Sequence, residues 1–313
     1  MKVLITGATG LVGREIVECC LSKNFLVHYL TTSRDKIEST KECRGFYWNP
    51  SKGEIDVKCF LGVTSIINLA GSSIATRWTP ENKRQILDSR INSLKTLRNG
   101  LQQFGGGEIS SFISASAIGI YPNSLSNYYT EDEKEVDSSF LGDVVRAWEQ
   151  EIDAFKTFNF ALSKIRIGLV LSEKKGALPK LLKPIQHYLG AAFGNGAQWQ
   201  SWIHVKDVAR MFLFVMENNL EGIFNGVGPN PVTNTKMVRE IAKAVDRPLF
   251  LPNIPVIIMR LILGKMSYLL FASQRVSSKK IEEEGFVFLF PNIRLALKDL
   301  CDRVSIVSTH NKK

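Results

Sequence analysis

The sequence predicts an α/β fold in which helices cover both faces of a doubly wound parallel sheet. Short apolar runs alternate with segments of helical periodicity, and a glycine-rich turn joins the first such pair. This alternation is typical of parallel sheets, whose neighbouring strands need crossover connections. Beyond about residue 170 the segments lengthen and prolines cluster. We therefore expect a smaller, partly interleaved C-terminal lobe.

The first thirty residues show the pattern most clearly. Residues 2–6 form a compact apolar run, residues 11–22 repeat apolar side chains at helical spacing, and residues 25–30 form a second run. Thr79 and Pro80 are suited to the N-cap and first turn of a long helix. Further strands are predicted at 65–69, from 111 onwards, 161–171 and 223–227, and further helices at 80–104, 141–158, 177–189, 205–218 and 235–245.

The composition is that of an ordinary globular protein. The formal net charge is +10, but the basic residues are scattered and no nucleic-acid-binding motif is present. The positive charge suits an anionic cofactor or substrate. Five cysteines without metal-ligand spacing indicate a reduced, intracellular protein with no metal site. No secretory signal is evident, so we expect a cytoplasmic protein. Because the basic residues are scattered, we also expect no nucleic-acid partner.

The most hydrophobic stretch covers residues 254–272. Arg260, Gly264 and Lys265 interrupt it, which makes it a poor membrane span. We interpret it as an amphipathic helix pair that caps a core, and we expect no membrane partner.

Thr6-Gly7-Ala8-Thr9-Gly10-Leu11-Val12-Gly13 forms a GxxGxxG turn between a strand and a helix. Such a turn lets the backbone approach a pyrophosphate, which the free N–H groups of the helix N-terminus then bind. A plain glycine turn is the alternative, but the strand–turn–helix context favours a dinucleotide. The predicted contacts are Gly7, Thr9, Gly10, Leu11, Val12 and Gly13.

The residues after the second strand predict which dinucleotide binds. An acidic residue there favours NAD, whereas this chain has Thr32, Ser33 and Arg34. Two hydroxyls and a guanidinium suit a 2′-phosphate, so we expect NADP rather than NAD. The alternative is that Arg34 is an ordinary surface arginine.

Several motifs together resemble the extended short-chain dehydrogenase/reductase superfamily, and more narrowly its atypical "epimerase family" branch. They are TGATGLVG (6–13), NLAG (68–71), RWTPENKRQILDSRI (77–91), FISASAIGIYP (112–122), RAWEQE (146–151), QWQSWIHVKD (198–207) and the stretch from about 248 to 300. The resemblance covers nearly the whole chain. It implies an NAD(P)-binding Rossmann domain over 1–170 and about 200–230, and a substrate lobe over about 171–199 and 231–300. Residues 248–300 would be its small C-terminal domain, and 301–313 a tail.

The superfamily moves protons with a tyrosine and a lysine four residues later. The resemblance places Leu141 and Val145 at these positions, and neither side chain can transfer a proton. The superfamily's serine is present as Ser116, with Ser114 as second choice, although either hydroxyl could instead cap backbone groups. His204 and Tyr121 are candidates for a replacement acid or base.

The remaining candidates line the expected cleft. Leu69, Ala70 and Gly71 form a turn expected to contact the cofactor, together with Ser114. Arg90 stands where the superfamily usually has asparagine, so it is a candidate for holding the cofactor or a substrate phosphate or carboxylate. A surface arginine and a structural histidine are the alternatives for Arg90 and His204. Tyr121 could instead pack beside the cofactor, and Trp148 could belong to the core. The predicted substrate contacts are Arg90, Ser116, Trp148, Trp202 and His204.

Two functional hypotheses follow. The first is an NADP-dependent oxidoreductase or sugar-nucleotide-epimerase-like enzyme for a small anionic or nucleotide-sugar-like substrate. The second is a non-catalytic NADP(H)-binding sensor or regulator, which the missing tyrosine and lysine favour. By analogy with the superfamily, a homodimer through helices 80–104 and 141–158 is expected.

Overall fold

The computed structural model describes the backbone of residues 1–310 and the side chains of residues 1–302. Within these residues the chain divides into two compact units. The first unit comprises residues 1–120, 136–166 and 209–224. The second comprises residues 121–135, 167–208 and the chain from 225 onward. The two units are therefore interleaved along the sequence.

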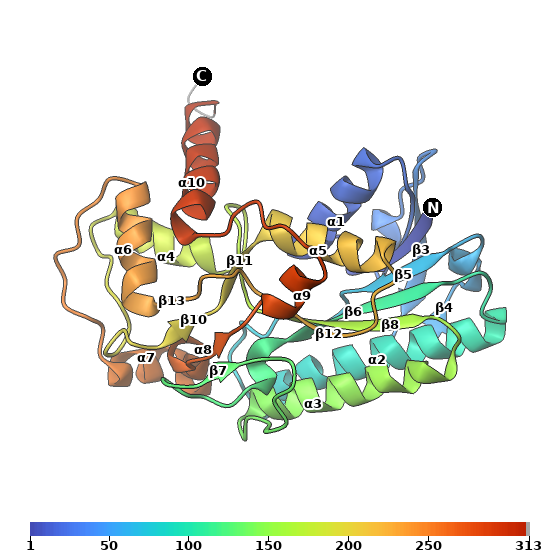
Figure 1. The fold of residues 1–313 in the computed structure, drawn as a ribbon, viewed down its shortest axis with the longest axis horizontal. Helices are drawn as coiled ribbons and strands as arrows, with labels where there is room; N and C mark the ends of the chain where they lie inside the picture. The colour runs from blue at the N-terminus through green and yellow to red at the C-terminus, as the bar shows by residue number, and fades with distance from the viewer. Residues whose placement is uncertain (311–313) are drawn as a thin grey trace. The chain divides into compact units, whose positions relative to one another are not determined.

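The first unit is built on a sheet with the strand order β12-β8-β6-β5-β1-β2-β3-β4 (Figure 1). Its strands are β1 (Lys2–Thr6), β2 (Leu26–Thr31), β3 (Cys43–Asn49), β4 (Glu54–Ile55), β5 (Ser65–Asn68), β6 (Ser111–Ala117), β8 (Ala161–Ile167) and β12 (Gly222–Gly226). β1 pairs in parallel with both β2 and β5, and β4 is antiparallel to β3. The order reverses beside β1, which confirms the predicted doubly wound parallel sheet.

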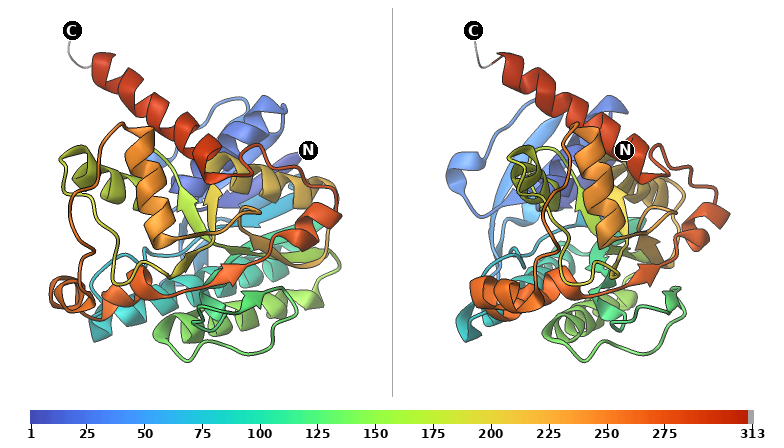
Figure 2. Two further views of the ribbon diagram at one scale, coloured as in Figure 1. Left: turned by 60° about the vertical axis from the view of Figure 1, so that its left-hand side comes forward. Right: turned by 90° about the vertical axis from the view of Figure 1, so that its left-hand side faces the viewer.

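Helices cover both faces of this sheet. α1 (Leu11–Ser22) and α5 (Val205–Glu217) lie on one face, and α2 (Pro80–Phe104) and α3 (Phe140–Asp153) lie on the other (Figures 1 and 2). As predicted, the Thr79 hydroxyl caps α2 by accepting a hydrogen bond from the Asn82 N–H at 3.2 Å.

The third strand, β3, was not predicted from the sequence. Cys43–Asn49 lacks a clean apolar alternation and contains a glycine in its middle. A Cβ at Gly45 would lie 2.6 Å from the ring of Tyr29 on β2, so the glycine makes room for that ring. A glycine within a strand often marks such a close approach.

Several predicted elements differ from their sequence patterns at the C-terminal end, among them the helix predicted at 177–189, which ends at Gln186. The predicted strand 161–171 is interrupted at Gly168, which separates β8 from β9 (Leu169–Leu171). A Cβ at Gly168 would lie 2.2 Å from the Ser201 carbonyl oxygen, so this close approach requires glycine. The helix predicted to end at residue 158 ends at Asp153 and continues as one 3₁₀ turn.

The second unit is mainly helical. Its longer helices are α4 (Ala177–Gln186), α6 (Asn234–Ala244), α7 (Val256–Leu263) and α10 (Ile293–His310). Short elements complete it: β7 (Tyr128–Tyr129), β10 (Trp199–Gln200), β11 (Trp202–His204), β13 (Val232–Thr233), α8 (Tyr268–Phe271), β14 (Arg275–Val276) and α9 (Lys279–Glu283).

Residues from α4, α6 and α10 share a buried apolar cluster that includes Leu178, Ile241 and Leu297. α10 runs to His310, into the segment expected to be a tail, and residues 311–313 lie outside the described part. Among the helices described, none combines the length and apolar character that crossing a membrane requires.

Candidate functional site

The glycine turn after β1 is sterically obligatory at two positions. Gly7 has a φ of +67°, and a Cβ there would lie 2.9 Å from the Leu69 carbonyl oxygen. A Cβ at Gly13 would lie 2.2 Å from the Gly7 carbonyl oxygen, so α1 can begin this close to the turn only with glycine at both sites. The N-cap of α1 is Gly10, which offers no side-chain hydrogen bond, so the first turn lacks side-chain capping.

A buried polar ladder joins the ends of three adjacent strands. The Thr6 hydroxyl on β1 donates to the Asn68 side-chain oxygen at 2.7 Å, and the Asn68 amide donates to the Ser114 hydroxyl at 2.9 Å. The Thr6 oxygen also accepts hydrogen bonds from the Leu69 and Ala70 N–H groups at 3.0 Å. This ladder fixes the turn after β5 at the point where the strand order reverses, where open α/β sheets bind ligands.

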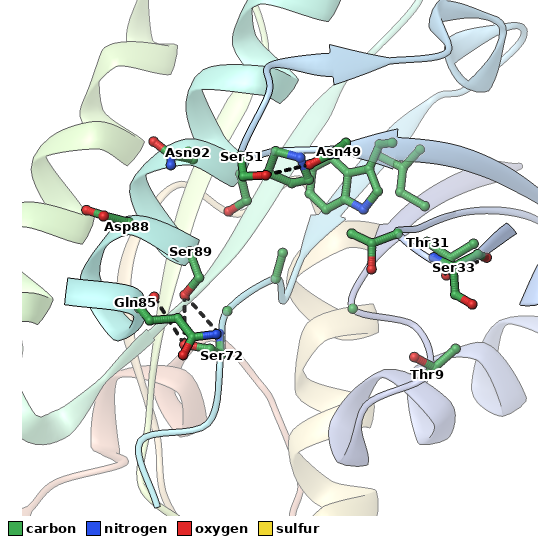
Figure 3. Close-up of a pocket in the computed structure, with 18 of the residues that line it drawn as sticks. Thr9, Thr31, Ser33, Asn49, Ser51, Ser72, Gln85, Asp88, Ser89 and Asn92 are labelled. Atoms are coloured by element: carbon green, nitrogen blue, oxygen red, sulfur yellow. Dashed lines mark hydrogen bonds between the residues drawn. The ribbon is translucent and has the colours of Figure 1, made fainter. Parts of the chain in front are cut away.

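A cavity of about 940 Å³ opens at these strand ends. Figure 3 shows Thr9, Thr31 and Ser33 on one side of it and Gln85, Asp88, Ser89 and Asn92, on α2, on the other. The Ser89 hydroxyl accepts a hydrogen bond from the Ser72 N–H at 2.9 Å. The cavity is within the size range of protein sites for small molecules and cofactors.

Six of the predicted cofactor contacts line this cavity: Gly7, Thr9, Thr32, Ser33, Ala70 and Gly71. The other predicted contacts are not among its lining residues: Gly10, Leu11, Val12, Gly13, Arg34, Leu69, Arg90 and Ser114. Of these, Gly10–Gly13 form the turn and first helical residues that follow Gly7 in the chain.

Two cations at the cavity were not singled out from the sequence. Lys36 and Arg84 line it, whereas the Arg34 guanidinium lies 3.9 Å above the ring of Tyr47. Lys36 follows Arg34 by two residues, and Arg84 belongs to the RWTPENKR segment, so the sequence contains a signal for each of them. The aromatic stack orients the Arg34 side chain.

Arg90 and Trp148 are brought together from α2 and α3. The Arg90 guanidinium carbon lies 4.9 Å from the centre of the Trp148 ring, and its Nη1 donates to the Ile86 and Ser72 carbonyl oxygens at 2.8 and 3.2 Å. Burial lowers the pKa of Arg90 to about 10, which leaves it charged at neutral pH. The buried Trp148 Nε1 has no hydrogen-bond partner among the described residues.

Ser116 belongs to a buried charged cluster that the sequence did not reveal. Its hydroxyl donates to Glu149 Oε1 at 2.6 Å. Arg166 donates from Nε to the same oxygen at 2.9 Å and from Nη2 to Oε2 at 3.0 Å. Lys164 lies 3.9 Å from Oε2 and donates to Asp153 at 2.8 Å. Two cations thus hold the carboxylate that accepts the hydrogen bond from the Ser116 hydroxyl.

Leu141 and Val145 lie beside Gly119, just after β6. A Cβ at Gly119 would lie 3.5 Å from the Leu141 Cβ and 3.9 Å from a Val145 methyl carbon. The face of α3 that the resemblance assigns to the proton-moving pair is therefore apolar at this point.

The other predicted site residues belong to the second unit and are fully buried there. The Tyr121 hydroxyl donates to the Asn225 side-chain oxygen at 2.7 Å. His204 Nδ1 accepts from the Lys206 N–H at 3.1 Å, and its Nε2 lies 3.3 Å from Asp299. Trp202 belongs to the apolar cluster and donates from Nε1 to the Asn230 carbonyl oxygen at 3.0 Å. The catalytic roles of Tyr121 and His204 stay predictions.

The first unit fits a nicotinamide dinucleotide on three counts. Its glycine turn is a cradle that a Cβ would fill, α1 begins without a side-chain cap, and Lys36 and Arg84 provide positive charge. In the described part of the chain, no three His, Cys, Asp or Glu side chains are grouped so as to hold a metal ion.

Sequence comparisons match two segments of the chain to known protein families. The NAD dependent epimerase/dehydratase family matches residues 3–227, and a domain of unknown function, DUF1731, matches residues 254–300. An epimerase family protein of Staphylococcus aureus (strain MRSA252) is 35% identical over 303 residues, which is 96% of this chain and 99% of the relative.

Two solved structures share the fold. The human epimerase family protein SDR39U1 (isoform 2) with NADPH has a TM-score of 0.83 at 23% identity, over 96% of this chain and 99% of that one. The UDP-glucose 4-epimerase of Thermus thermophilus in complex with NAD has a TM-score of 0.76 at 17% identity, over 96% and 98% of the two chains.

The family match spans most of the chain, and the staphylococcal relative aligns over nearly its whole length. The resemblance drawn from the motifs is thereby confirmed. The chain belongs to the NAD dependent epimerase/dehydratase family.

Proposed function

We propose that this protein binds NADP(H) in the cavity of the first unit and acts as an oxidoreductase or epimerase on a small anionic or nucleotide-sugar-like substrate. The observation that carries the proposal is the glycine cradle of Gly7 and Gly13 at the edge of a cavity at the sheet's reversal point. The fold relative crystallised with NADPH and the family match support the same cofactor class.

The preference for NADP rests on the residues after β2. Thr32 and Ser33 line the cavity together with Lys36, and Arg34 is stacked on Tyr47 close by in the chain. Hydroxyl and cationic groups at this position suit a 2′-phosphate, and no carboxylate follows β2 directly to bind a free ribose hydroxyl.

When bound, the nicotinamide cofactor would supply hydride transfer, and the residues of the first unit would hold and orient the substrate beside it. The Ser116 hydroxyl already donates its hydrogen bond to Glu149. The Ser116 oxygen would therefore hold a substrate hydroxyl by accepting a hydrogen bond from it. Arg90, which remains charged and has donors beyond its Nη1, would hold a phosphate or carboxylate of the substrate. Trp148 would donate its buried N–H to a bound oxygen.

A second candidate function is a non-catalytic NADP(H) sensor. The placement of Leu141 and Val145 beside Gly119 favours it, because these apolar side chains occupy the face from which the superfamily's tyrosine and lysine act. Cofactor binding would then be retained without proton transfer.

Titration of NADPH and NADH, followed by cofactor fluorescence, tests binding and selectivity. We expect Gly10→Val to lose the binding of both cofactors. Arg34→Ala or Lys36→Ala should lower the affinity for NADPH about tenfold, because each removes one charge-assisted contact, and should leave the affinity for NADH unchanged. Arg44→Ala is the matched control, because Arg44 is exposed and does not line the cavity. Unchanged NADPH affinity in both cation variants would refute the 2′-phosphate assignment.

Turnover separates the two functions. The NADPH-loaded protein is mixed with sugar-nucleotide and carbonyl libraries, and the nicotinamide absorbance is followed. Turnover that disappears in Ser116→Ala, with NADPH affinity retained, supports the enzyme. Tight NADPH binding without turnover across the libraries supports the sensor.

A further inference from the structure

α7 in the second unit is an apolar helix without an apolar covering. Its eight residues, VIIMRLIL, include no buried residue. Leu261 is 78% exposed, Ile257 67% and Ile262 59%, which is far more than an amphipathic helix that caps a core would show. The helix pair expected between residues 254 and 272 is present, but the side chains of α7 are largely turned away from the core.

The exposed apolar surface continues into the segment before α7. Phe250 is 72% exposed, and its ring stacks against that of Tyr188, which follows α4, at 6.5 Å between centroids. Backbone hydrogen bonds join Ile254 to Ala192 and Gly194 at 2.8 and 2.9 Å. Figure 2 (right) shows this segment descending from α6 to α7. We define the docking face as Tyr188, Leu189, Phe250, Leu251, Ile257, Ile258, Leu261 and Ile262.

The charges near the docking face are mostly positive, although Asp246, directly before Arg247, is exposed. From Arg247 to Lys280 the sequence contains no Asp or Glu, and Arg260 and Lys265 are exposed within or beside α7. Lys180 and Lys183 are exposed on α4, where they border a shallow groove with His187 and Leu189. The surface therefore combines exposed aliphatic and aromatic side chains with several nearby cations, which outnumber the exposed carboxylate of Asp246.

We propose that the docking face binds the surface of an anionic phospholipid bilayer. An apolar face flanked by Lys and Arg is the composition of helices that lie in the interface, where apolar side chains enter the headgroup region and cations meet lipid phosphates. α7 is too short to span a membrane, since eight residues cover about 12 Å. A two-fold contact between copies is disfavoured, because it sets each cation-rich face against its own image.

This inference changes the expectation from the sequence, which considered only a spanning helix. It is independent of the proposed cofactor and reaction, because all its residues belong to the second unit. It predicts a protein that associates with membranes reversibly and in a salt-dependent manner.

Co-sedimentation of the full chain with lipid vesicles tests the proposal. We expect binding to vesicles of phosphatidylcholine with phosphatidylglycerol, release at high salt, and weak binding to phosphatidylcholine alone. Ile257→Glu with Leu261→Glu should abolish binding. Arg260→Gln with Lys265→Gln should weaken it about 25-fold, which is about fivefold for each cation. Leu61→Glu is the matched control, because Leu61 is 54% exposed and belongs to the first unit.

Circular dichroism melts of each variant verify that the fold is retained, as expected for side chains this exposed. The proposal is overturned if the wild type does not sediment with anionic vesicles, or if Ile257→Glu with Leu261→Glu sediments equally well. It is also overturned if light scattering finds a dimer that this variant converts to a monomer, because the face would then be covered by a second copy.

Discussion

The hydroxyl of Ser116 on β6 donates a 2.6 Å hydrogen bond to the buried carboxylate of Glu149 on α3. Glu149 is held in turn by Arg166 on β8, so three elements of the first unit meet in one polar cluster. The arrangement fixes the direction of the Ser116 proton. A serine oriented in this way has an oxygen lone pair that could accept a hydrogen bond, so its role toward a substrate stays a prediction.

Glu149→Gln tests the energetic importance of this cluster. The substitution removes the carboxylate charge that Arg166 and Lys164 contact in a buried cluster, so we expect the free energy of unfolding to fall by ~3–5 kcal/mol. Urea denaturation of the two proteins measures the difference. Arg146→Gln is the control on the same helix, where an exposed pair with Asp143 should contribute less than ~1 kcal/mol. Equal stabilities of the two variants would contradict the prediction.

Gly13→Ala tests the steric requirement of the glycine turn. The new Cβ would lie 2.2 Å from the Gly7 carbonyl oxygen, so the backbone must shift at a cost of ~1–3 kcal/mol. NADPH affinity should fall in parallel, because the same shift displaces the turn. Gly119→Ala is the comparison, since its Cβ would make ordinary contacts with Leu141 at 3.5 Å. The idea fails if Gly13→Ala melts and binds like the wild type.

His28 should make the protein less stable in mild acid. Burial is the main cause that lowers the pKa of His28 below 6.5, although its Nδ1 lies 2.7 Å from the Cys59 carbonyl oxygen. The unfolded chain then binds the proton first, so stability falls as the pH drops from about 6.5 towards the lower pKa of the folded protein. Urea denaturation at several pH values between neutral and mildly acidic measures this slope.

His28→Gln should reduce that slope, because no group at this position titrates in the variant. The control is His187→Gln, where the side chain is exposed at the end of α4. An unaltered pH dependence in His28→Gln would show that another group is responsible.

The cysteines should differ in reactivity according to their burial. Burial raises the pKa of Cys20 to about 12 and raises that of Cys59 further, so neither thiol forms a thiolate near pH 8. We expect both to resist an aromatic disulfide reagent until urea unfolds the chain. Mass spectrometry of labelled peptides measures this, with the half-buried Cys43 as the internal comparison. Rapid labelling of Cys59 in the folded protein would be inconsistent with its position.

Local patterns were sufficient for much of the first unit. The turn from Gly7 to Gly13, the capped helix α2 and the parallel sheet follow from glycine positions, capping residues and apolar periodicity. β3 was not predicted, because its central glycine is required by a contact with another strand. The glycine leaves room for the ring of Tyr29 on β2. The catalytic assignments of Ser116, Tyr121 and His204 rest on motif positions and remain predictions.

The sequence by itself determined the cofactor cradle, the doubly wound sheet, and the presence of Leu141 and Val145 where a proton-moving pair would stand. Only the tertiary structure decided that Ser116 binds Glu149, which Arg166 holds, that Lys36 and Arg84 line the cavity, and that α7 exposes its apolar side chains. The physical reason is the difference between interactions that are local in the sequence and interactions between segments far apart in it. Periodicity and turn chemistry describe each residue's neighbours along the chain, whereas ion pairs and burial depend on which distant segments pack together.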